Sequence, residues 1–83
     1  MKFYVVDDDP DVLAFIGMLL ERGGHEVVLL ESSRKALREI PQSHADCIIT
    51  DVMMPELDGF ELTRELRRRP ELEHTKIIVV SAN

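Results

Sequence analysis

Short apolar runs alternate along the chain with longer stretches in which apolar residues recur at a helical spacing. The four runs span residues 3–6, 26–30, 47–50 and 76–80. The first of them, Phe-Tyr-Val-Val, is apolar throughout, which is typical of a strand buried on both faces of a sheet. We therefore interpret the four runs as β-strands.

The stretch after the first run carries the signals of a helix. Asp9 can serve as the N-cap, and Pro10 occupies the favoured first helical position. The apolar residues that follow have a helical period; they are Val12, Phe15, Ile16, Leu19 and Leu20. Gly23 and Gly24 end this pattern, so the sequence predicts an amphipathic helix between Pro10 and Gly23.

Two further helices are predicted from similar signals. Ser32 or Ser33 opens a short helix that Pro41 closes. Asp58 can cap another, with Glu61 reaching back in a capping-box arrangement, and Pro70 marks its end. One face of this last helix carries the small and apolar residues Gly59, Leu62 and Leu66.

The order of these elements is βαβαβαβ, which predicts an α/β fold with a parallel sheet and right-handed crossovers. The length of 83 residues allows one domain. No linker, repeat or low-complexity segment divides residues 1–83.

Acidic residues follow two of the predicted strands directly. Asp7, Asp8 and Asp9 follow the first strand, and Asp51 follows the third. In an open α/β sheet, ligands bind in the crevice at the carboxyl ends of the strands. These carboxylates are therefore the best functional candidates in the chain.

Composition narrows the class of function. Hydrophobic residues make up 45% and charged residues 31%, which is a globular balance. A net charge of −6 argues against direct binding of nucleic acid or an anionic membrane, and no apolar run is long enough to span a bilayer. The single cysteine, Cys47, lies in an apolar run, so no disulfide framework is expected and a reducing cytoplasm fits best.

Three segments together resemble the receiver domain of bacterial two-component response regulators. They are Val5-Val6-Asp7-Asp8-Asp9-Pro10, Asp51-x-x-Met54-Pro55-x-x-Asp58-Gly59 and Val79-Val80-Ser81-Ala82. The resemblance covers the whole chain and implies a flavodoxin-like, doubly wound parallel sheet with strand order 2-1-3-4. Receivers run to about 120 residues, so the resemblance implies a partial domain, 1–83, that lacks the fifth strand and the last helices.

The resemblance also implies a role for each site residue. Asp51 would be the phosphoacceptor, and Ser81 the hydroxyl that hydrogen-bonds the phosphoryl group. A divalent cation, Mg²⁺, would be held by Asp51, by Asp8 directly and by Asp7 through water. The backbone carbonyl of Met53 would complete the protein ligands.

The chemistry of phosphoryl transfer gives this residue set an independent rationale. An anionic carboxylate that attacks an anionic phosphoryl donor needs positive charge nearby. Mg²⁺ prefers hard oxygen ligands and bridges to phosphate oxygens. The simpler interpretation is that Asp7, Asp8 and Asp9 only cap a helix and Asp51 only ends a strand.

Other motifs fit the sequence less well. Asp7, Asp9 and Asp11 begin like a calcium-binding EF-hand loop, but Val12 stands where that loop needs glycine and Met18 where it needs glutamate. A haloacid-dehalogenase-type phosphatase also uses an aspartate at a strand end. It requires a second aspartate two residues later, where this chain has Met53.

Three expectations about activity and assembly follow from the resemblance. The family's lysine on the fifth strand, which pairs with the acceptor, has no counterpart before Asn83. Residues 76–80 would then form an open sheet edge beside uncovered apolar surface, which favours a homodimer formed by edge pairing or element swapping. Met53 and Asn83, which would line the entrance for attacking water, offer no obvious general base, so slow self-dephosphorylation is expected.

The expected function is that of a phosphoacceptor module in two-component signalling. Its phosphodonor would be the phosphohistidine of a sensor histidine kinase or phosphotransfer protein, and it would catalyse at most its own phosphorylation and dephosphorylation. Two alternatives remain. In the first, the chain is a degenerate receiver that acts as a phosphorylation-independent interaction module. In the second, it is a fragment of a longer response regulator.

Overall fold

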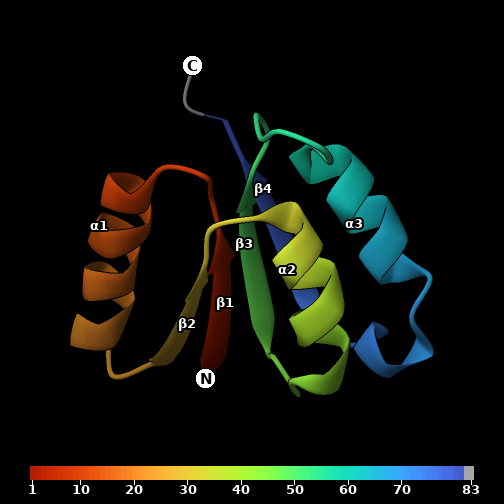
Figure 1. Cartoon of the computed structure of the whole chain (residues 1–83). Helices are drawn as coiled ribbons and strands as arrows, with labels where there is room; N and C mark the ends of the chain where they lie inside the picture. Colours follow the sequence, from red (N-terminus) through yellow and green to blue (C-terminus); the bar gives the residue numbers. More distant parts are fainter. Residues whose placement is uncertain (82–83) are drawn as a thin grey trace.

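The computed structural model describes residues 1–81 as a four-stranded parallel sheet with helices on both faces (Figure 1). The strand order is β2-β1-β3-β4, as predicted. The strands are β1 (Lys2–Val6), β2 (Glu26–Leu30), β3 (Cys47–Asp51) and β4 (Lys76–Val80). The helices are α1 (Pro10–Arg22), α2 (Ser33–Glu39) and α3 (Gly59–Arg67), with the short 3-10 helices η1 (Ile40–Gln42) and η2 (Pro70–Leu72).

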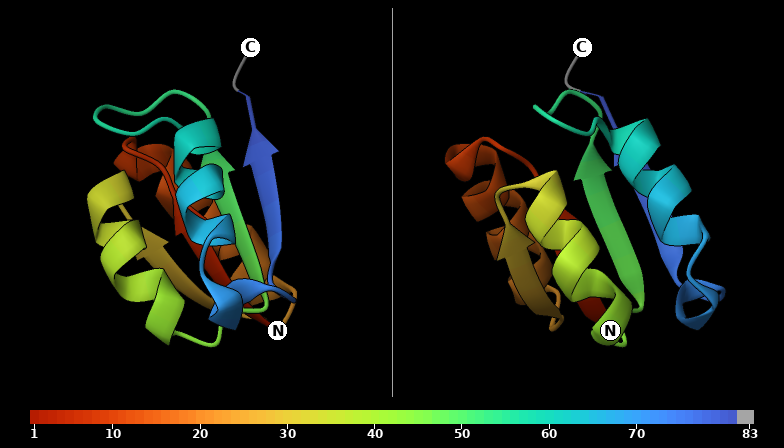
Figure 2. Two further views of the ribbon diagram at one scale, coloured as in Figure 1. Left: turned by 90° about the vertical axis from the view of Figure 1, so that its right-hand side faces the viewer. Right: turned by 45° about the vertical axis from the view of Figure 1, so that its right-hand side comes forward.

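The sheet separates two layers of helices. Helix α1 lies on one face, and α2 and α3 lie on the other, as the views in Figures 1 and 2 agree. All strand pairs are parallel, from Lys2 beside Glu26 at one side to Asp51 beside Val80 at the other. The carboxyl ends of the strands therefore meet at one edge of the sheet. None of the helices in residues 1–81 has the length and apolar character needed to cross a membrane.

The predicted caps set where the helices begin. The Asp9 side chain accepts a hydrogen bond from the Asp11 backbone N–H, and Pro10 is the first residue of α1. Ser32 caps α2. Asp58 and Glu61 form the predicted capping box of α3, with hydrogen bonds of 2.8 and 3.0 Å.

Most of the core lies between the sheet and the pair α2 and α3. Its buried residues are Tyr4, Val6, Leu30, Ala36, Ile40, Ala45, Ile48, Leu62, Leu66 and Leu72. The predicted face of α3 is confirmed, because Gly59, Leu62 and Leu66 are its buried residues. The strands of this core pair with one another and pack against the helices. Pairing and packing together fix the positions of the strand ends.

The packed face of α1 differs from the face that the apolar period indicated. Leu13 and Gly17 are the buried residues, whereas Phe15 and Leu19 are 58% and 50% exposed. Helix α1 packs on β1 and β2, and Gly17 lets it approach Leu29 closely, since a Cβ there would lie 3.2 Å from the Leu29 side chain. The side of α1 that carries Phe15 and Leu19 has no such packing partner among the described residues.

Helix α3 ends at Arg67, before Pro70, and the η2 turn follows. The Arg67 guanidinium donates hydrogen bonds to the backbone oxygens of Leu72 (3.0 Å) and Thr75 (2.7 Å). The arginine thus ties the end of α3 to the start of β4, a contact that its place in the run Arg67-Arg68-Arg69 did not reveal.

Candidate functional site

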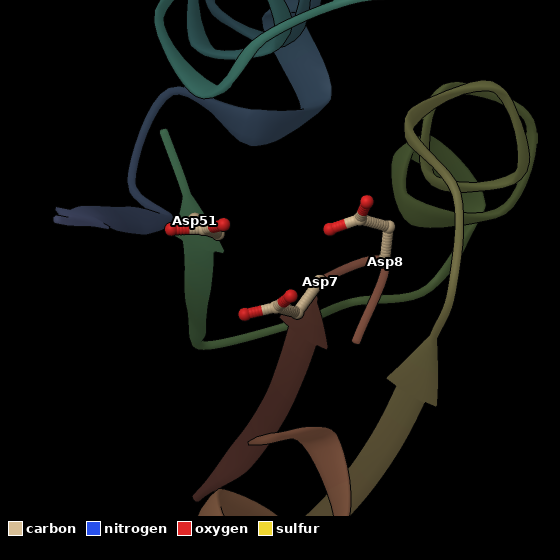
Figure 3. Close-up of side chains that lie close together, drawn as sticks. All are labelled: Asp7, Asp8 and Asp51. Atoms are coloured by element: carbon tan, nitrogen blue, oxygen red, sulfur yellow. The ribbon is translucent and has the colours of Figure 1, made fainter. Parts of the chain in front are cut away.

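The strand register brings the predicted acidic residues together. Val6, the last residue of β1, pairs with Thr50 of β3, so Asp7 and Asp51 follow paired positions. One oxygen each from Asp7, Asp8 and Asp51 lies within 4.8 Å of the others. Figure 3 shows the carboxyl groups of Asp7 and Asp8 directed toward Asp51 at the end of β3. We call these three residues the acidic cluster.

Asp7 is fixed more firmly than its neighbours in the cluster. It is only 5% exposed, whereas Asp8 is exposed and Asp51 is half-buried. Its carboxylate accepts a hydrogen bond of 2.9 Å from the Asp9 backbone N–H. Its own backbone N–H donates to the Leu30 carbonyl at 3.1 Å, which extends the pairing of β1 with β2 by one residue.

The pKa of the Asp7 carboxyl is raised above its ordinary value of 3.8. Burial is the main cause, because it disfavours the charged form, and the charges of Asp51, Asp8 and Asp9 add to it. The hydrogen bond from Asp9 acts in the opposite direction and lowers the pKa. The neighbouring carboxylates thus make the charged form of Asp7 less favourable.

A cavity of about 290 Å³ opens over the acidic cluster. Its lining residues are Asp7, Asp8, Asp9, Val12, Asp51, Val80 and Ser81. Ser81 therefore lies in the same cavity as the acidic cluster, directly after β4, the strand next to that of Asp51. Among the described residues, the lining includes no lysine or arginine.

Val12 and Val80 form an apolar part of the cavity wall that was not recognised in the sequence. Val12 was interpreted only as part of the helical period, and Val80 only as a strand residue. The position of Val80 beside Asp51 follows from the β3–β4 register, which the predicted strand order already contains. The place of Val12, one helical turn from the Asp9 cap, depends on the direction in which α1 leaves the sheet.

Met53, which was expected beside the site, does not line the cavity in residues 1–81. Met53 lies two residues after Asp51, and its side chain is 73% exposed. Asn83 lies outside the described residues.

The loop that follows Asp51 is closed at its base by α3. The Gly59 backbone N–H donates to the Val52 carbonyl at 2.8 Å, and the Val52 N–H donates to Val80 at 3.1 Å. A Cβ on Gly59 would lie 2.2 Å from the backbone oxygen of Asp51. Only glycine permits this approach, so α3 can begin directly against the end of β3.

The tip of the same loop contacts the start of α2. The Ser33 hydroxyl donates to the Pro55 carbonyl and accepts from the Leu57 N–H, both at 3.4 Å. Arg34 forms an ion pair with Glu56. Of the two serines expected to open α2, Ser32 is the cap, and Ser33 instead contacts the loop.

The acidic cluster has the donors that a hard divalent cation requires. Carboxylate oxygens are preferred ligands of Mg²⁺, which also retains several waters and therefore needs few protein ligands. Three carboxylates whose oxygens converge within 4.8 Å fit such an ion. The open cavity leaves room for water and for a further anionic group.

A parallel α/β sheet in 2-1-3-4 order with carboxylates at the ends of β1 and β3 defines a class of flavodoxin-like proteins. Residues 3–83 match the family model of the response regulator receiver domain. The chain therefore belongs to the response regulator receiver family, whose members serve two-component signalling. This confirms the resemblance and the fold class inferred from the motifs.

The chain is similar in sequence to known proteins at identities of 30–34%. The chain is 34% identical over 82 residues to the gliding motility regulatory protein of Myxococcus xanthus. The aligned region covers 99% of the chain and 11% of that protein. It is 30% identical to protein PilH of Pseudomonas aeruginosa, with coverage of 96% of the chain and 66% of PilH. The chain thus spans less than two thirds of these relatives.

A solved structure with the same fold is the receiver domain of a sensor histidine kinase from Pseudomonas aeruginosa. It superimposes with a TM-score of 0.92 at 30% identity and covers 99% of this chain and 67% of that chain. That crystal structure has a magnesium ion coordinated in the active site cleft.

Proposed function

We propose that residues 1–83 act as a receiver unit that accepts a phosphoryl group on the carboxylate of Asp51. The observation that carries this proposal is the convergence of the Asp7, Asp8 and Asp51 oxygens within 4.8 Å inside an open cavity. Helix capping alone accounts for Asp9, whose side chain binds the Asp11 N–H. It does not account for a buried Asp7 directed toward Asp51.

Each residue of the site has a distinct role in the proposed reaction. A carboxylate oxygen of Asp51 attacks phosphorus and forms the new P–O bond, and the bond from phosphorus to the donor breaks. Ser81 lies in the same cavity, and its hydroxyl donates a hydrogen bond to a phosphoryl oxygen. Asp8 and Asp51 bind Mg²⁺ directly, Asp7 binds it through water, and the Met53 carbonyl completes the protein ligands. The cation supplies positive charge that offsets the repulsion between carboxylate and phosphoryl oxygens.

The proposed phosphodonor is the phosphohistidine of a sensor histidine kinase or phosphotransfer protein. The P–N bond of the donor breaks, and its imidazole nitrogen keeps the electron pair. The Asp51 acyl phosphate is the product. Its formation would shift the population of loop conformations at the carboxyl ends of the strands, where a partner can detect it. A cytoplasmic location, without nucleic-acid or membrane contact by this unit, accompanies this proposal.

The second candidate function is a phosphorylation-independent interaction module. The observation that favours it is the absence of a basic residue among the described residues that line the cavity. Without a fixed cation, the protein itself provides little compensation for a phosphoryl group at Asp51. The two candidates differ in whether Mg²⁺ and a phosphoryl group bind at all.

One experiment separates them. The chain is incubated with Mg²⁺ and a small acyl phosphate, and its intact mass is measured. Phosphoacceptor function predicts a single phosphoryl increment that Asp51→Asn abolishes. Asp11→Asn is the matched control, because Asp11 lies outside the cavity lining and should leave the increment unchanged. No increment and no Mg²⁺ binding would favour the interaction module.

A further inference from the structure

The start of α2 is attached to the loop that follows Asp51. Ser33, the first residue of α2, is 1% exposed, and its hydroxyl lies between the Pro55 carbonyl and the Leu57 N–H. A buried hydroxyl that both donates and accepts fixes two backbone groups of the loop at once. We call this set, with the Arg34–Glu56 ion pair, the α2–loop contact.

The loop backbone between these two hydrogen bonds adopts an unusual conformation. Glu56 has a φ of 71°, in the left-handed region that residues with a Cβ rarely occupy. Such a conformation persists where the surrounding contacts compensate its cost. The Leu57 N–H closes a turn around Glu56 by donating to the Pro55 carbonyl at 2.9 Å. The contacts that hold this turn against α2 are those of Ser33 with Pro55 and Leu57 and of Arg34 with the Glu56 carboxylate.

The loop is therefore held at two places. At its base, Gly59 bonds to Val52, which in turn bonds to Val80 beside the acidic cluster. At its tip, Ser33 and Arg34 hold Pro55, Glu56 and Leu57. Met53, the nearest exposed residue to Asp51 in this loop, lies between the two attachments.

We infer that Ser33, assisted by the Arg34–Glu56 ion pair, is a positioning residue that holds the loop after Asp51 in the conformation competent for Mg²⁺ binding and phosphorylation. This inference rests on the proposed function. Ser33 is not among the described residues that line the cavity, and its hydroxyl bonds to the loop. It acts through the backbone of the loop, and its effect is to raise the fraction of molecules in which the loop is correctly placed.

The size of the effect follows from that fraction. Apparent affinity falls in proportion to the population of the competent state. Loss of a buried hydrogen-bonded hydroxyl should weaken Mg²⁺ binding by about three- to tenfold. The ion pair is more exposed, at 74% and 47% for the two side chains, so its loss should have a smaller effect of about twofold.

The test compares Ser33→Ala with Ser32→Ala. Ser32 caps α2 through the Lys35 N–H and makes no contact with the loop among the hydrogen bonds of the described residues. Both variants lose a serine hydroxyl at the start of α2, but only Ser33→Ala releases the loop. Mg²⁺ affinity is measured by calorimetric titration with the metal alone. Amide hydrogen exchange of residues 52–57 is measured without metal.

The expected result is weaker Mg²⁺ binding and faster exchange of the loop amides in Ser33→Ala, with both properties unchanged in Ser32→Ala. Ser33→Ala behaviour equal to wild type, or equal effects in both variants, would overturn the inference. In the second case the hydroxyl would only support the helix.

The ion pair allows a rescue experiment. Arg34→Glu and Glu56→Arg should each accelerate exchange of the loop amides, and the double variant should restore it. Absence of restoration would remove the ion pair from the α2–loop contact. A wild-type protein that binds no Mg²⁺ would refute the proposed function and this inference with it. Wild-type Mg²⁺ affinity that persists in Ser33→Ala would refute this inference alone.

Discussion

Asp7 is the residue at which stability and the proposed function oppose each other most clearly. Its carboxylate is buried next to two others, and its raised pKa shows that the folded protein disfavours the charged form. Because this charged form is the one that binds a cation, the residue is suited to ligand binding at the expense of the metal-free fold. The same arrangement predicts how stability changes with pH.

In the metal-free chain, the contribution of Asp7 to stability should fall as pH rises. The pKa of its carboxyl is higher in the folded state than the ordinary 3.8, so the folded state binds the proton more tightly. The contribution is complete below the ordinary pKa and is lost as pH rises through the raised one. Asp7→Asn should therefore gain stability relative to wild type as pH rises above the ordinary pKa of 3.8.

Urea unfolding of both proteins at several pH values, in the presence of a chelator, measures this difference. The Asn side chain can still accept the Asp9 N–H, so the local hydrogen bond is retained. A stability difference that is independent of pH would contradict the assignment. Adding Mg²⁺ should stabilise wild type more than Asp7→Asn, because only binding to the folded state contributes.

At the residue scale, the sequence was sufficient for the cavity residues that follow strands. Asp7, Asp8 and Asp51 were predicted because parallel strands end at one edge, and Ser81 was placed by the resemblance. Their convergence is confirmed by the structure, and their roles remain proposals. Ser33 could not be assigned from the sequence, because its partners Pro55 and Leu57 lie in a loop whose path no periodicity describes.

Among the elements, α3 depends on a single glycine for its position. Its first residue, Gly59, packs against the backbone of Asp51 so closely that a methyl group would overlap the carbonyl oxygen. The start of α3 and the end of β3 thus form one rigid unit. Any side chain at this position must push the helix away from the strand that carries the proposed phosphoacceptor.

Gly59→Ala should destabilise the chain by about 2–3 kcal/mol, since the obstructing atom is backbone and cannot rotate away. Gly17→Ala is the matched control. A Cβ there would meet the Leu29 side chain at 3.2 Å, which can adjust, and alanine favours the helix. The free energy of unfolding in urea distinguishes them, and equal effects would contradict the geometry at Asp51.

The connection from α3 to β4 depends on Arg67. Replacing Arg67 with alanine removes two hydrogen bonds to the Leu72 and Thr75 carbonyls and should lower stability by roughly 1–2 kcal/mol. Arg68→Ala, at a residue whose ion pair with Glu65 is exposed, should change stability by about 0.5 kcal/mol or less. Thermal unfolding of both variants tests the contrast, which would disappear if Arg67 were only a solvated charge.

Element boundaries show where sequence patterns are informative. Strands β2 and β4 match the predicted ranges, and the capping signals locate the starts of all three helices. The end of α3 was predicted at Pro70 but lies at Arg67. The η2 turn follows, and the Arg67 side chain bonds to carbonyls beyond the helix. The packed face of α1 was misjudged because apolar residues occur on two of its sides and only contacts with the sheet choose between them.

Viewed as a whole, the described molecule has one well-covered sheet face and one that is partly open. On the α1 side, Ile78 of β4 is 46% exposed and Phe15 of α1 is 58% exposed. Strand β4 is also at the edge of the sheet in the described residues. Edge strands beside apolar surface favour association with another chain.

The 83-residue chain should therefore self-associate, through edge pairing at β4 or exchange of elements. Light scattering over a range of concentrations should give a mass above that of the monomer. Ile78→Lys should lower this mass. Phe60→Lys, at an apolar residue of α3 that is 57% exposed, should not. A monomer of wild type that unfolds cooperatively at high concentration would contradict the expectation.

The order of the strands also affects how the chain can fold. Strand β1 lies between β2 and β3, so Phe3 pairs with both Val27 and Cys47. Every pairing in the sheet joins segments that are distant in sequence, and such contacts form slowly because a long loop must close first. During synthesis, β1 can pair fully only after the residues of β2 and β3 have been made. The acidic cluster is therefore assembled only once β3 has paired with β1, so a nascent chain lacks its proposed phosphoacceptor site until Asp51 and the rest of β3 have been made.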